Sequence, residues 1–270
     1  MNLIDAIIYG AIQGFSEFLP ISSSGHLALI PHVMHIQDPG VVFDLMMHLG
    51  TALAVLVYFR KEILIYIKTL TPSLLSISGG TSSQWFSRNF ILSTVVSVFF
   101  ILLLLPISKM ARDPWIIIFN LSFFGSLLWF ADHKNKKMVL TDFAMEKGMQ
   151  WKLAIIIGAA QAIAIFPGVS RSGITLTAAL LLGMKRKEAG SFSFLMSLPI
   201  ILAGIAKELP DLMNAPNEKV MVLFLGVLTS FLVGFLTIHF FMKLIGSINL
   251  KYFAFYRWFV AIIMIVLLKF

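Results

Sequence analysis

The sequence contains no cysteine and few charged residues. The lack of cysteine excludes disulfides, thiolate metal sites and thiolate nucleophiles. Charged residues make up 13% of the 270 residues, whereas a soluble globular domain has roughly 25%. Hydrophobic residues make up 59%, and the mean hydropathy is +0.91. This composition predicts an all-α polytopic membrane protein that forms a single integral membrane domain over residues 1–270.

The chain also lacks basic residues near its N-terminus, since no Lys or Arg precedes Arg60. A secretory signal peptide begins with a basic region, so we expect no signal peptide here. The formal net charge of +8 is compatible with nucleic-acid binding, but the basic residues lie in short segments between apolar runs. That distribution is typical of membrane topology determinants. We therefore expect membrane lipids as partners and no nucleic acid.

Apolar runs long enough to form membrane helices recur along the whole chain. Two of the helices are interrupted by a proline, Pro20 or Pro167, and resume as short helices. A polar loop over residues 76–83 and a basic loop over residues 132–152 separate longer apolar runs. The predicted helices cover residues 3–19, 23–35, 41–67, 89–106, 115–131 and 153–166, a short helix ending at Gly183, and then residues 191–205, 220–242 and 252–268.

The two interrupted helices belong to an internal repeat. Five polar or glycine residues recur 148 positions later: Gly10, Gln13, Ser22, Ser24 and Gly25 are matched by Gly158, Gln161, Ser170, Ser172 and Gly173. Several apolar residues of the preceding helix recur at the same offset, but such identities are common in membrane helices. The glutamine and the Ser-x-Ser-Gly motif are more specific. The sequence therefore predicts a duplication, with repeat 1 over about residues 1–132 and repeat 2 over about residues 150–270.

Each predicted repeat consists of a broken-helix pair followed by three spans. An odd number of spans inverts the second copy relative to the first, and inverted repeats place binding sites near the bilayer midplane where the repeats meet. We therefore predict an inverted-topology repeat with two re-entrant broken-helix hairpins and about six full spans. The alternative is that residues 3–35 cross the membrane as one full span plus a short stub.

The distribution of lysine and arginine predicts the orientation. Most of these residues, including Arg60, Lys61 and the cluster over residues 185–187, fall on one side of the predicted spans, which we expect to be cytoplasmic. Both termini and the mouth of the first hairpin then face outward, and the second hairpin enters from the cytoplasm.

The first broken helix carries an ionisable residue, Glu17, between Phe15 and Leu19. A carboxylate at membrane depth is costly and indicates function by default. Gln13 lies one turn earlier, so both side chains share a helix face. The alternative is a carboxylate near a helix end that faces the surface or an aqueous lumen.

Each proline break is followed by serines and a glycine that are typical of a helix N-terminus. Free amides and the helix dipole at such a terminus favour an anion, and Arg171 adds a guanidinium suited to phosphate oxygens. Helix capping alone could explain either serine cluster. Two matched clusters, one with an arginine at membrane depth, favour an anion-binding site shared by the two hairpin tips.

Further polar residues follow these termini. His26 lies four residues after Ser22, and a histidine can transfer protons or be transiently phosphorylated. For an isolated histidine, a core or interfacial position would be the simpler explanation, but the neighbouring residues of His26 favour a role in the site. Asp44 and His48, spaced i and i+4, are equally compatible with a structural ion pair and with an outer layer of the site. We expect Arg257 to pair internally or to extend toward the interface rather than to act in the chemistry.

These motifs resemble those of bacterial undecaprenyl-diphosphate phosphatases of the bacitracin-resistance type. The resemblance covers nearly the whole chain and rests on Gln13-x-x-x-Glu17, on Ser22 to His26, and on Pro167-Gly168-x-Ser170-Arg171-Ser172-x-x-Thr175. It implies hydrolysis of a C55 polyprenyl diphosphate to the monophosphate and phosphate at the outer face of the bacterial inner membrane. This reaction recycles the lipid carrier of peptidoglycan synthesis and confers bacitracin resistance.

For this reaction we hypothesise the following roles of the site residues, and the resemblance implies that a divalent cation is needed. Arg171 binds the diphosphate, Glu17 acts as general base or as a ligand of Mg²⁺ or Ca²⁺, and His26 orients the nucleophile or protonates the leaving group. The nucleophile is Ser23 or a water molecule. The residues expected to bind the substrate are Gln13, Ser22, Ser24, Gly25, Ser170, Ser172, Gly173 and Thr175. A homodimer is one possible assembly. The rival hypothesis from another class is a polyprenyl-phosphate transporter or flippase.

Overall fold

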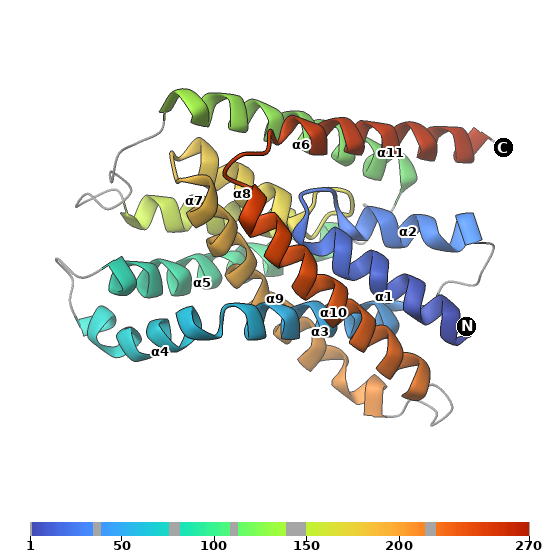
Figure 1. The fold of residues 1–270 in the computed structure, drawn as a ribbon, viewed down its shortest axis with the longest axis horizontal. Coiled ribbons are helices and arrows are strands. Elements are labelled where there is room, and N and C mark those ends of the chain that lie inside the picture. The colour runs from blue at the N-terminus through green and yellow to red at the C-terminus, as the bar shows by residue number, and fades with distance from the viewer. Residues whose placement is uncertain are drawn as a thin grey trace.

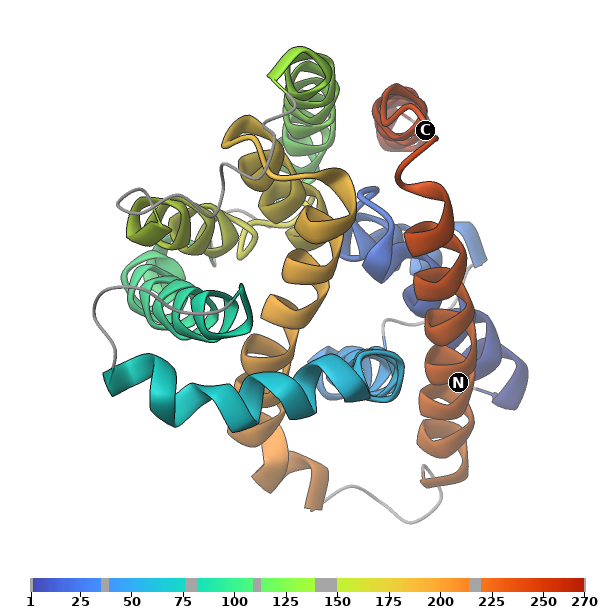
Figure 2. The ribbon, with the colours of Figure 1, turned by 60° about the vertical axis from the view of Figure 1, so that its left-hand side comes forward.

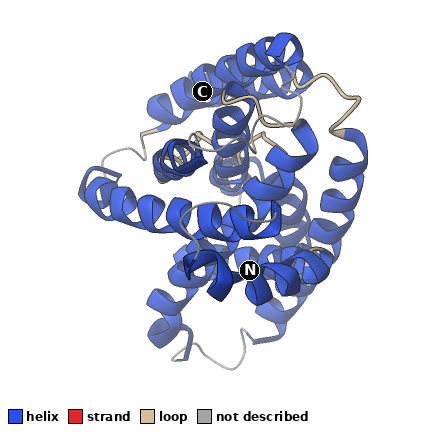
Figure 3. Cartoon of the chain, turned by 90° about the vertical axis from the view of Figure 1, so that its left-hand side faces the viewer, coloured by secondary structure: helices blue, strands red, loops and turns tan. Residues whose placement is uncertain are grey.

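The computed structural model describes residues 2–34, 39–75, 82–108, 113–138, 150–213 and 220–269, and these residues form helices and short connections without strands (Figures 1 and 3). The predicted all-α class is therefore confirmed. The described helices are α1 (Leu3–Phe18), α2 (Ser23–Met34), α3 (Val41–Tyr58), α4 (Arg60–Leu75), α5 (Ser82–Ser108), α6 (Pro114–Met138), α7 (Gln150–Ile163), α8 (Arg171–Leu181), α9 (Arg186–Met213), α10 (Val220–Leu244) and α11 (Lys251–Lys269).

The long helices are sufficiently apolar to span a bilayer. Among the described residues, five helices qualify (α5, α6, α9, α10 and α11), and the bent pair α3–α4 makes a sixth span if it is counted as one. Their outward side chains are large and apolar, as a lipid-facing surface requires. The protein is thus a polytopic membrane protein with five or six spans, in agreement with the prediction of about six.

Several predicted helix bounds are wrong. The predicted helix over residues 41–67 is two helices bent by 75°, because the buried Phe59 ends α3 and packs against Phe194. No proline or glycine marks this bend in the sequence. α5, α6 and α9 extend beyond their apolar cores into polar turns, which hydropathy does not detect. Most of the predicted polar loop over residues 76–83 and of the loop over residues 132–152 lies outside the described residues.

Two pairs of short helices form the predicted hairpins. α1 and α2 have 16 and 12 residues, and α7 and α8 have 14 and 11, whereas a full span needs about 20. Figure 1 shows that α1 and α2 extend from the centre toward one end of the molecule, and α7 and α8 toward the opposite end. The tips touch: Ser172 Oγ donates to the carbonyl of Leu19 over 3.1 Å.

Equivalent helices of the two halves run antiparallel. In the pair α3–α9, Leu45 lies against Gly204 near one end and Phe59 against Phe194 near the other. The pair α6–α11 behaves likewise, and α3 lies between α9 and α10 (Figure 2). A two-fold axis in the membrane plane produces this arrangement. The helix directions therefore agree with the predicted inversion.

Each hairpin packs its first helix on a span of the other half. Gly10 of α1 lies against Gly226 of α10, where an added Cβ would come within 2.4 Å of a carbonyl oxygen. Gly158 of α7, the repeat equivalent of Gly10, lies against Ser93 of α5, and the corresponding distance is 2.5 Å. Small residues allow this close approach of backbones in membranes. The exchange of hairpins brings both tips to the middle of the molecule.

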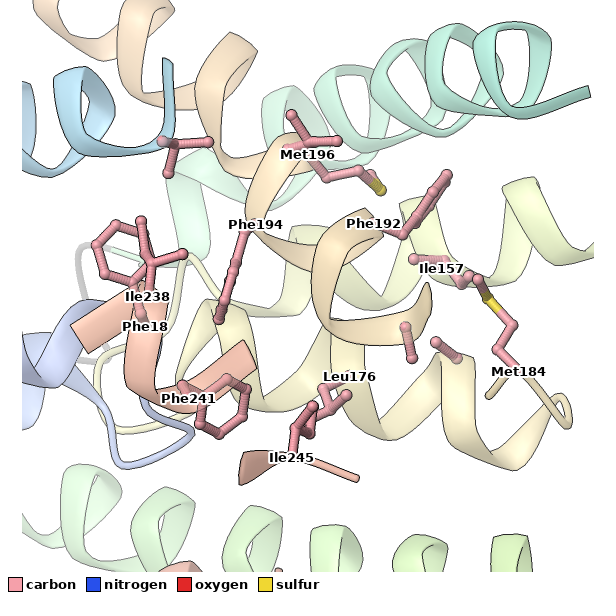
Figure 4. Packing of buried hydrophobic residues seen from close by; sticks show 14 of the residues in the cluster. Phe18, Ile157, Leu176, Met184, Phe192, Phe194, Met196, Ile238, Phe241 and Ile245 are labelled. Carbon is pink, nitrogen blue, oxygen red and sulfur yellow. The ribbon is translucent and has the colours of Figure 1, made fainter. Parts of the chain in front are cut away.

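The largest hydrophobic cluster lies behind the tips. Phe18 packs edge to face on Phe194 and Phe241 packs against Phe194 at a tilt, with ring centroids 5.2 and 5.6 Å apart (Figure 4). Leu176 of α8 belongs to the same cluster. Two of the helices that carry tip residues, α1 and α8, are thereby packed on one core.

Candidate active site

Glu17 at the end of α1 is the centre of a polar cluster that joins the two hairpins. Its side chain is buried, and its Oε1 forms an ion pair with Arg171 of the second hairpin. Its Oε2 accepts hydrogen bonds from Ser23 Oγ at 2.7 Å and from Gln13 Nε2 at 2.9 Å. The structure thus brings together four residues of the predicted site, and it places the carboxylate of one repeat against the guanidinium of the other.

The backbone turns that follow the two proline breaks are alike. Ser22 and Ser170 have φ values of 77° and 71°, and they are the non-glycine residues with positive φ in the described chain. Each serine Oγ accepts the amide of the glycine three residues later, Gly25 or Gly173, over 3.4 and 3.1 Å. Left-handed backbone is strained for serine. Its occurrence at equivalent positions indicates that both tips need the same backbone conformation for a shared function.

These turns direct two helix N-termini toward the same place. The first amides of α2 and α8 have no acceptor within their own helix. Ser24 Oγ also accepts the amide of Gly168, at 3.4 Å, so the hydroxyls of one tip contact the backbone of the other. Paired helix termini with adjacent hydroxyls suit an anion such as phosphate.

A cavity of about 290 Å³ opens beside the ion pair. Its walls combine polar groups of both hairpins with apolar side chains of the spans. The lining residues are Glu17, Ser23, Ser24, Leu45, His48, Ile101, Gln161, Ala164, Ile165, Ser170, Arg171, Ile200, Ile201 and Gly204. A charged headgroup would find its partners here, and the apolar walls suit the first part of a lipid tail.

His48 of α3 belongs to this cavity. Its Nδ1 donates to the backbone carbonyl of Asp44 at 2.8 Å, since a carbonyl oxygen only accepts, and its Nε2 lies 3.5 Å from Glu17 Oε2. Of the two alternatives from the sequence, this geometry favours a layer of the site. The sequence signal for this position is the i, i+4 pair of Asp44 and His48 at the start of an apolar helix.

Gln161, the repeat equivalent of Gln13, was not predicted as a site residue. It lines the cavity and is buried, and its Nε2 donates to Ser97 Oγ at 3.1 Å while its Oε1 has no hydrogen-bond partner. The repeat could have identified Gln161, because its equivalent Gln13 was already predicted to lie beside Glu17.

His26 lies elsewhere. Its ring nitrogens contact the carbonyl of Ser22 at 2.7 Å and the hydroxyl of Tyr256 at 2.8 Å. Together with Tyr256 it lines a separate, largely apolar cavity of about 530 Å³. The structure does not bring His26 to Glu17 or Arg171, and its action on the phosphate stays a prediction.

Thr175 also points away from the cavity. It is buried, donates to the carbonyl of Arg171 at 2.8 Å and forms a 2.5 Å hydrogen bond with Ser193 of α9. It therefore holds α8 on α9 behind the site. Ser172 links its tip to Leu19 of the other tip.

Comparisons with known proteins agree with the resemblance predicted from the motifs. A model of the family described as bacitracin resistance protein BacA matches residues 6–263. Undecaprenyl-diphosphatase 1 of Pseudoalteromonas translucida (strain TAC 125) is 38% identical over 270 residues, which cover 99% of each chain. Undecaprenyl-diphosphatase of Aliivibrio salmonicida (strain LFI1238) is 41% identical over 261 residues, which cover 95% of each chain. With its motifs and nearly its whole length matched, the chain belongs to the bacitracin resistance protein BacA family.

Proposed function

We propose that this protein hydrolyses undecaprenyl diphosphate to undecaprenyl phosphate and phosphate, at the cavity between the hairpin tips. The reaction would recycle the lipid carrier for cell-wall synthesis. The names of two relatives that align over nearly their whole length support the proposal. The single observation that carries it is the contact of Glu17 with both Ser23 and Arg171, which combines a base, a hydroxyl and a phosphate-binding cation.

The diphosphate binds to the guanidinium of Arg171, to the serine hydroxyls and to the amides at the two helix N-termini. Arg171 suits phosphate because its fork of donors can bind two oxygens at once. Glu17 and Arg171 neutralise each other in the resting site, and the incoming phosphate shares the guanidinium. Most of the catalysis of phosphoryl transfer consists of such positioning and charge stabilisation.

Glu17 acts as the general base. Ser23 Oγ already donates to its Oε2 at 2.7 Å. When Ser23 attacks the terminal phosphorus, its proton passes to Glu17, the bond from that phosphorus to the bridging oxygen breaks, and undecaprenyl phosphate leaves. Water then hydrolyses the phosphoserine. A water molecule held by Glu17 in place of the hydroxyl gives the same products in one displacement.

A divalent cation, Mg²⁺ or Ca²⁺, is part of the proposal. The described residues contain no group of three or more His, Asp or Glu side chains that could hold a metal ion. Glu17 and Gln161, whose amide oxygen has no hydrogen-bond partner, offer oxygens of the kind that hard cations bind. They fit a cation whose other ligands are diphosphate oxygens. Such a cation would neutralise charge on the phosphates.

The proposed location is the bacterial inner membrane, with the cavity open to the outer face. The start of α1 and the end of α11 lie at the same end of the molecule (Figure 1), as expected if both termini share one side. The excess of basic residues on the predicted cytoplasmic side supports an outward orientation of that end.

Phosphate release by the purified protein in detergent tests the proposal. Detergent removes both compartments, so a flippase without hydrolase activity would release nothing. We expect wild type to release phosphate from undecaprenyl diphosphate, and Glu17→Gln and Arg171→Ala to lose at least about 100-fold in kcat. Glu62→Gln and Arg60→Ala, at exposed positions of α4, are matched controls and keep wild-type activity. Wild-type rates in the two site variants would overturn the assignment.

A further inference from the structure

Arg257 is a fully buried charge that the proposed reaction does not use. It lies in the last span, α11, and its side chain has no exposed surface. No Asp or Glu among the described residues forms an ion pair with it. A buried, unpaired guanidinium is costly unless other groups satisfy its donors. Its partners therefore indicate why it is there.

The guanidinium donates to backbone carbonyls from three segments. Nη2 donates to Gly168 at 2.7 Å and Val169 at 3.1 Å in the second tip, and Nη1 donates to Pro20 in the first tip at 3.5 Å. Nε and Nη2 also donate to carbonyls of α6 at 3.0 and 3.1 Å. One side chain thus binds both hairpin tips and anchors them to the same span. The predicted internal pairing of Arg257 is confirmed, with carbonyls as partners.

These bonds fix the orientation of the amides next to the cavity. In a planar trans peptide the C=O and N–H point in opposite directions. Because the carbonyl of Val169 points to Arg257, the N–H of Ser170 points away from it. Ser170 is the strained cap of α8 and lines the cavity. Strained backbone persists only where the surroundings determine it strongly, and Arg257 supplies two of those restraints.

The first tip is held in the same manner. Pro20 follows the end of α1, whose last residue is Phe18, and lies two residues before the other strained serine, Ser22. Its carbonyl reaches the same guanidinium that holds Gly168 and Val169. The guanidinium of Arg257 thus sets the distance between the tips, and with it the contact of Glu17 and Arg171. It forms no bond to the side chain of either residue.

We propose that Arg257 is a positioning residue for the phosphatase reaction, acting through the backbone carbonyls of both tips. It holds the strained turns so that the carboxylate, the hydroxyls and the amides face one phosphate. This inference rests on the proposed function for its kinetic part. Its structural part, the fixed distance between the hairpins, is independent of any substrate.

Arg186 provides a matched control. It is another mostly buried arginine that donates to backbone carbonyls, at 2.8 Å to Ile248 and at 3.4 Å to Ile245, and it forms an ion pair with Asp132. It links α9 to the connection between α10 and α11 and makes no bond to either tip. Arg186→Lys therefore removes comparable hydrogen bonds without releasing the hairpins.

The kinetic test compares Arg257→Lys with Arg186→Lys in detergent, each normalised to folded protein by thermal unfolding. Arg257→Lys keeps the charge but loses the directed bonds. We expect kcat to fall at least about 30-fold with little change in KM, because misplaced donors weaken binding of the transition state most. Arg186→Lys should stay within about twofold in kcat while losing thermal stability. Equal kcat losses in both variants, or less than a threefold loss in Arg257→Lys, would overturn the inference.

A second variant covers the case in which Arg257→Lys fails to fold. Gly125 of α6 lies under the arginine stem, so an added Cβ would lie 3.4 Å from its Cβ, Cδ and Nε. Gly125→Val displaces the guanidinium and leaves all five carbonyls and the charge in place. The same loss of kcat is expected, and an unchanged kcat would count against the proposal.

A distance measurement separates the inference from the proposed function. The chain has no native cysteine, so spin labels can be attached to Phe15→Cys of α1 and Ile156→Cys of α7, both exposed. Double electron–electron resonance should give a narrow distribution that broadens with Arg257→Lys and stays narrow with Arg186→Lys. A wild type without phosphatase activity would refute the function alone. Unchanged distributions in Arg257→Lys would refute the positioning role.

Discussion

Ser23 and Arg171 occupy the same position in the two repeats, 148 residues apart, and both donate to the carboxylate of Glu17. The repeat equivalent of Glu17 is Ile165, which lines the same cavity but carries no charge. The site is therefore asymmetric in chemistry although the backbone of the two tips is alike. One repeat supplies the carboxylate and a hydroxyl, and the other supplies the guanidinium.

Arg171→Lys should reduce activity although it keeps the charge. Lysine cannot present the planar fork of donors to two phosphate oxygens. We expect kcat/KM for undecaprenyl diphosphate to fall by about 10- to 100-fold. Arg60→Lys, at an exposed position, is the control and should match wild type. If the two variants were equally active, Arg171 would serve only as a point charge.

Ser23→Ala tests the identity of the nucleophile. If Ser23 attacks the phosphorus, kcat should fall by at least about 1,000-fold, as with other nucleophiles of this type. Mass spectrometry of acid-quenched wild type during turnover should detect phosphate on Ser23. Ser24→Ala removes the neighbouring cavity hydroxyl and should lose less than about tenfold. A loss below tenfold in Ser23→Ala would instead identify water as the nucleophile.

His48→Gln should lower the rate of catalysis, although His48 lies outside the sequence motifs. Its Nε2 lies 3.5 Å from Glu17 Oε2 and the side chain lines the cavity, so its loss should change the position of the carboxylate. We expect kcat to fall at least about tenfold. His239→Gln on α10, exposed and outside the cavities described above, is the control. The measurement is phosphate release at saturating substrate, and equal rates in both variants would remove His48 from the site.

The His26–Tyr256 contact should behave as a structural pair. We expect His26→Gln and Tyr256→Phe each to lower the free energy of unfolding by about 1 kcal/mol, the contribution of a typical hydrogen bond. The double variant should be no less stable than the worse single variant, because both remove the same bond. Thermal unfolding gives the stabilities, and phosphate release is measured in parallel. A loss of activity in His26→Gln far beyond that in Tyr256→Phe would support the predicted catalytic role.

Gly10→Ala should destabilise the packing of α1 on α10. The added Cβ would lie 2.4 Å from the carbonyl oxygen of Gly226, and overpacking of this kind costs about 1–3 kcal/mol. Gly246→Ala is the control, because its nearest atom would be 3.8 Å away, at the far end of a lysine side chain. A lower midpoint of thermal unfolding for Gly10→Ala alone is expected. Equal midpoints would mean that the helices can separate freely.

The repeat made much of this structure predictable. Gln13 and the Ser-x-Ser-Gly motif recur with one offset, and an odd number of spans per repeat implies inversion. The meeting of Glu17 with Arg171 follows from that symmetry without any knowledge of side-chain packing. Both residues are ionisable, and ionisable side chains are rare within membrane segments, so they can be recognised in the sequence.

Features set by tertiary packing were not predictable. The bend at Phe59 has no proline or glycine, and its cause is burial against Phe194 on a distant helix. The direction of His26 depends on Tyr256, which is 230 residues away. Sequence spacing places a side chain on a helix face, but it does not say which partner that face meets.

The head-to-head contact of the tips determines how many reaction centres a duplicated protein has in a bilayer. Two separate copies with opposite orientation would carry two reaction centres, one reached from each leaflet. Here both copies contribute to one shared pocket, and Ile165 of the second copy lies at the position equivalent to Glu17. The proposed reaction therefore has one centre, although the architecture is two-sided.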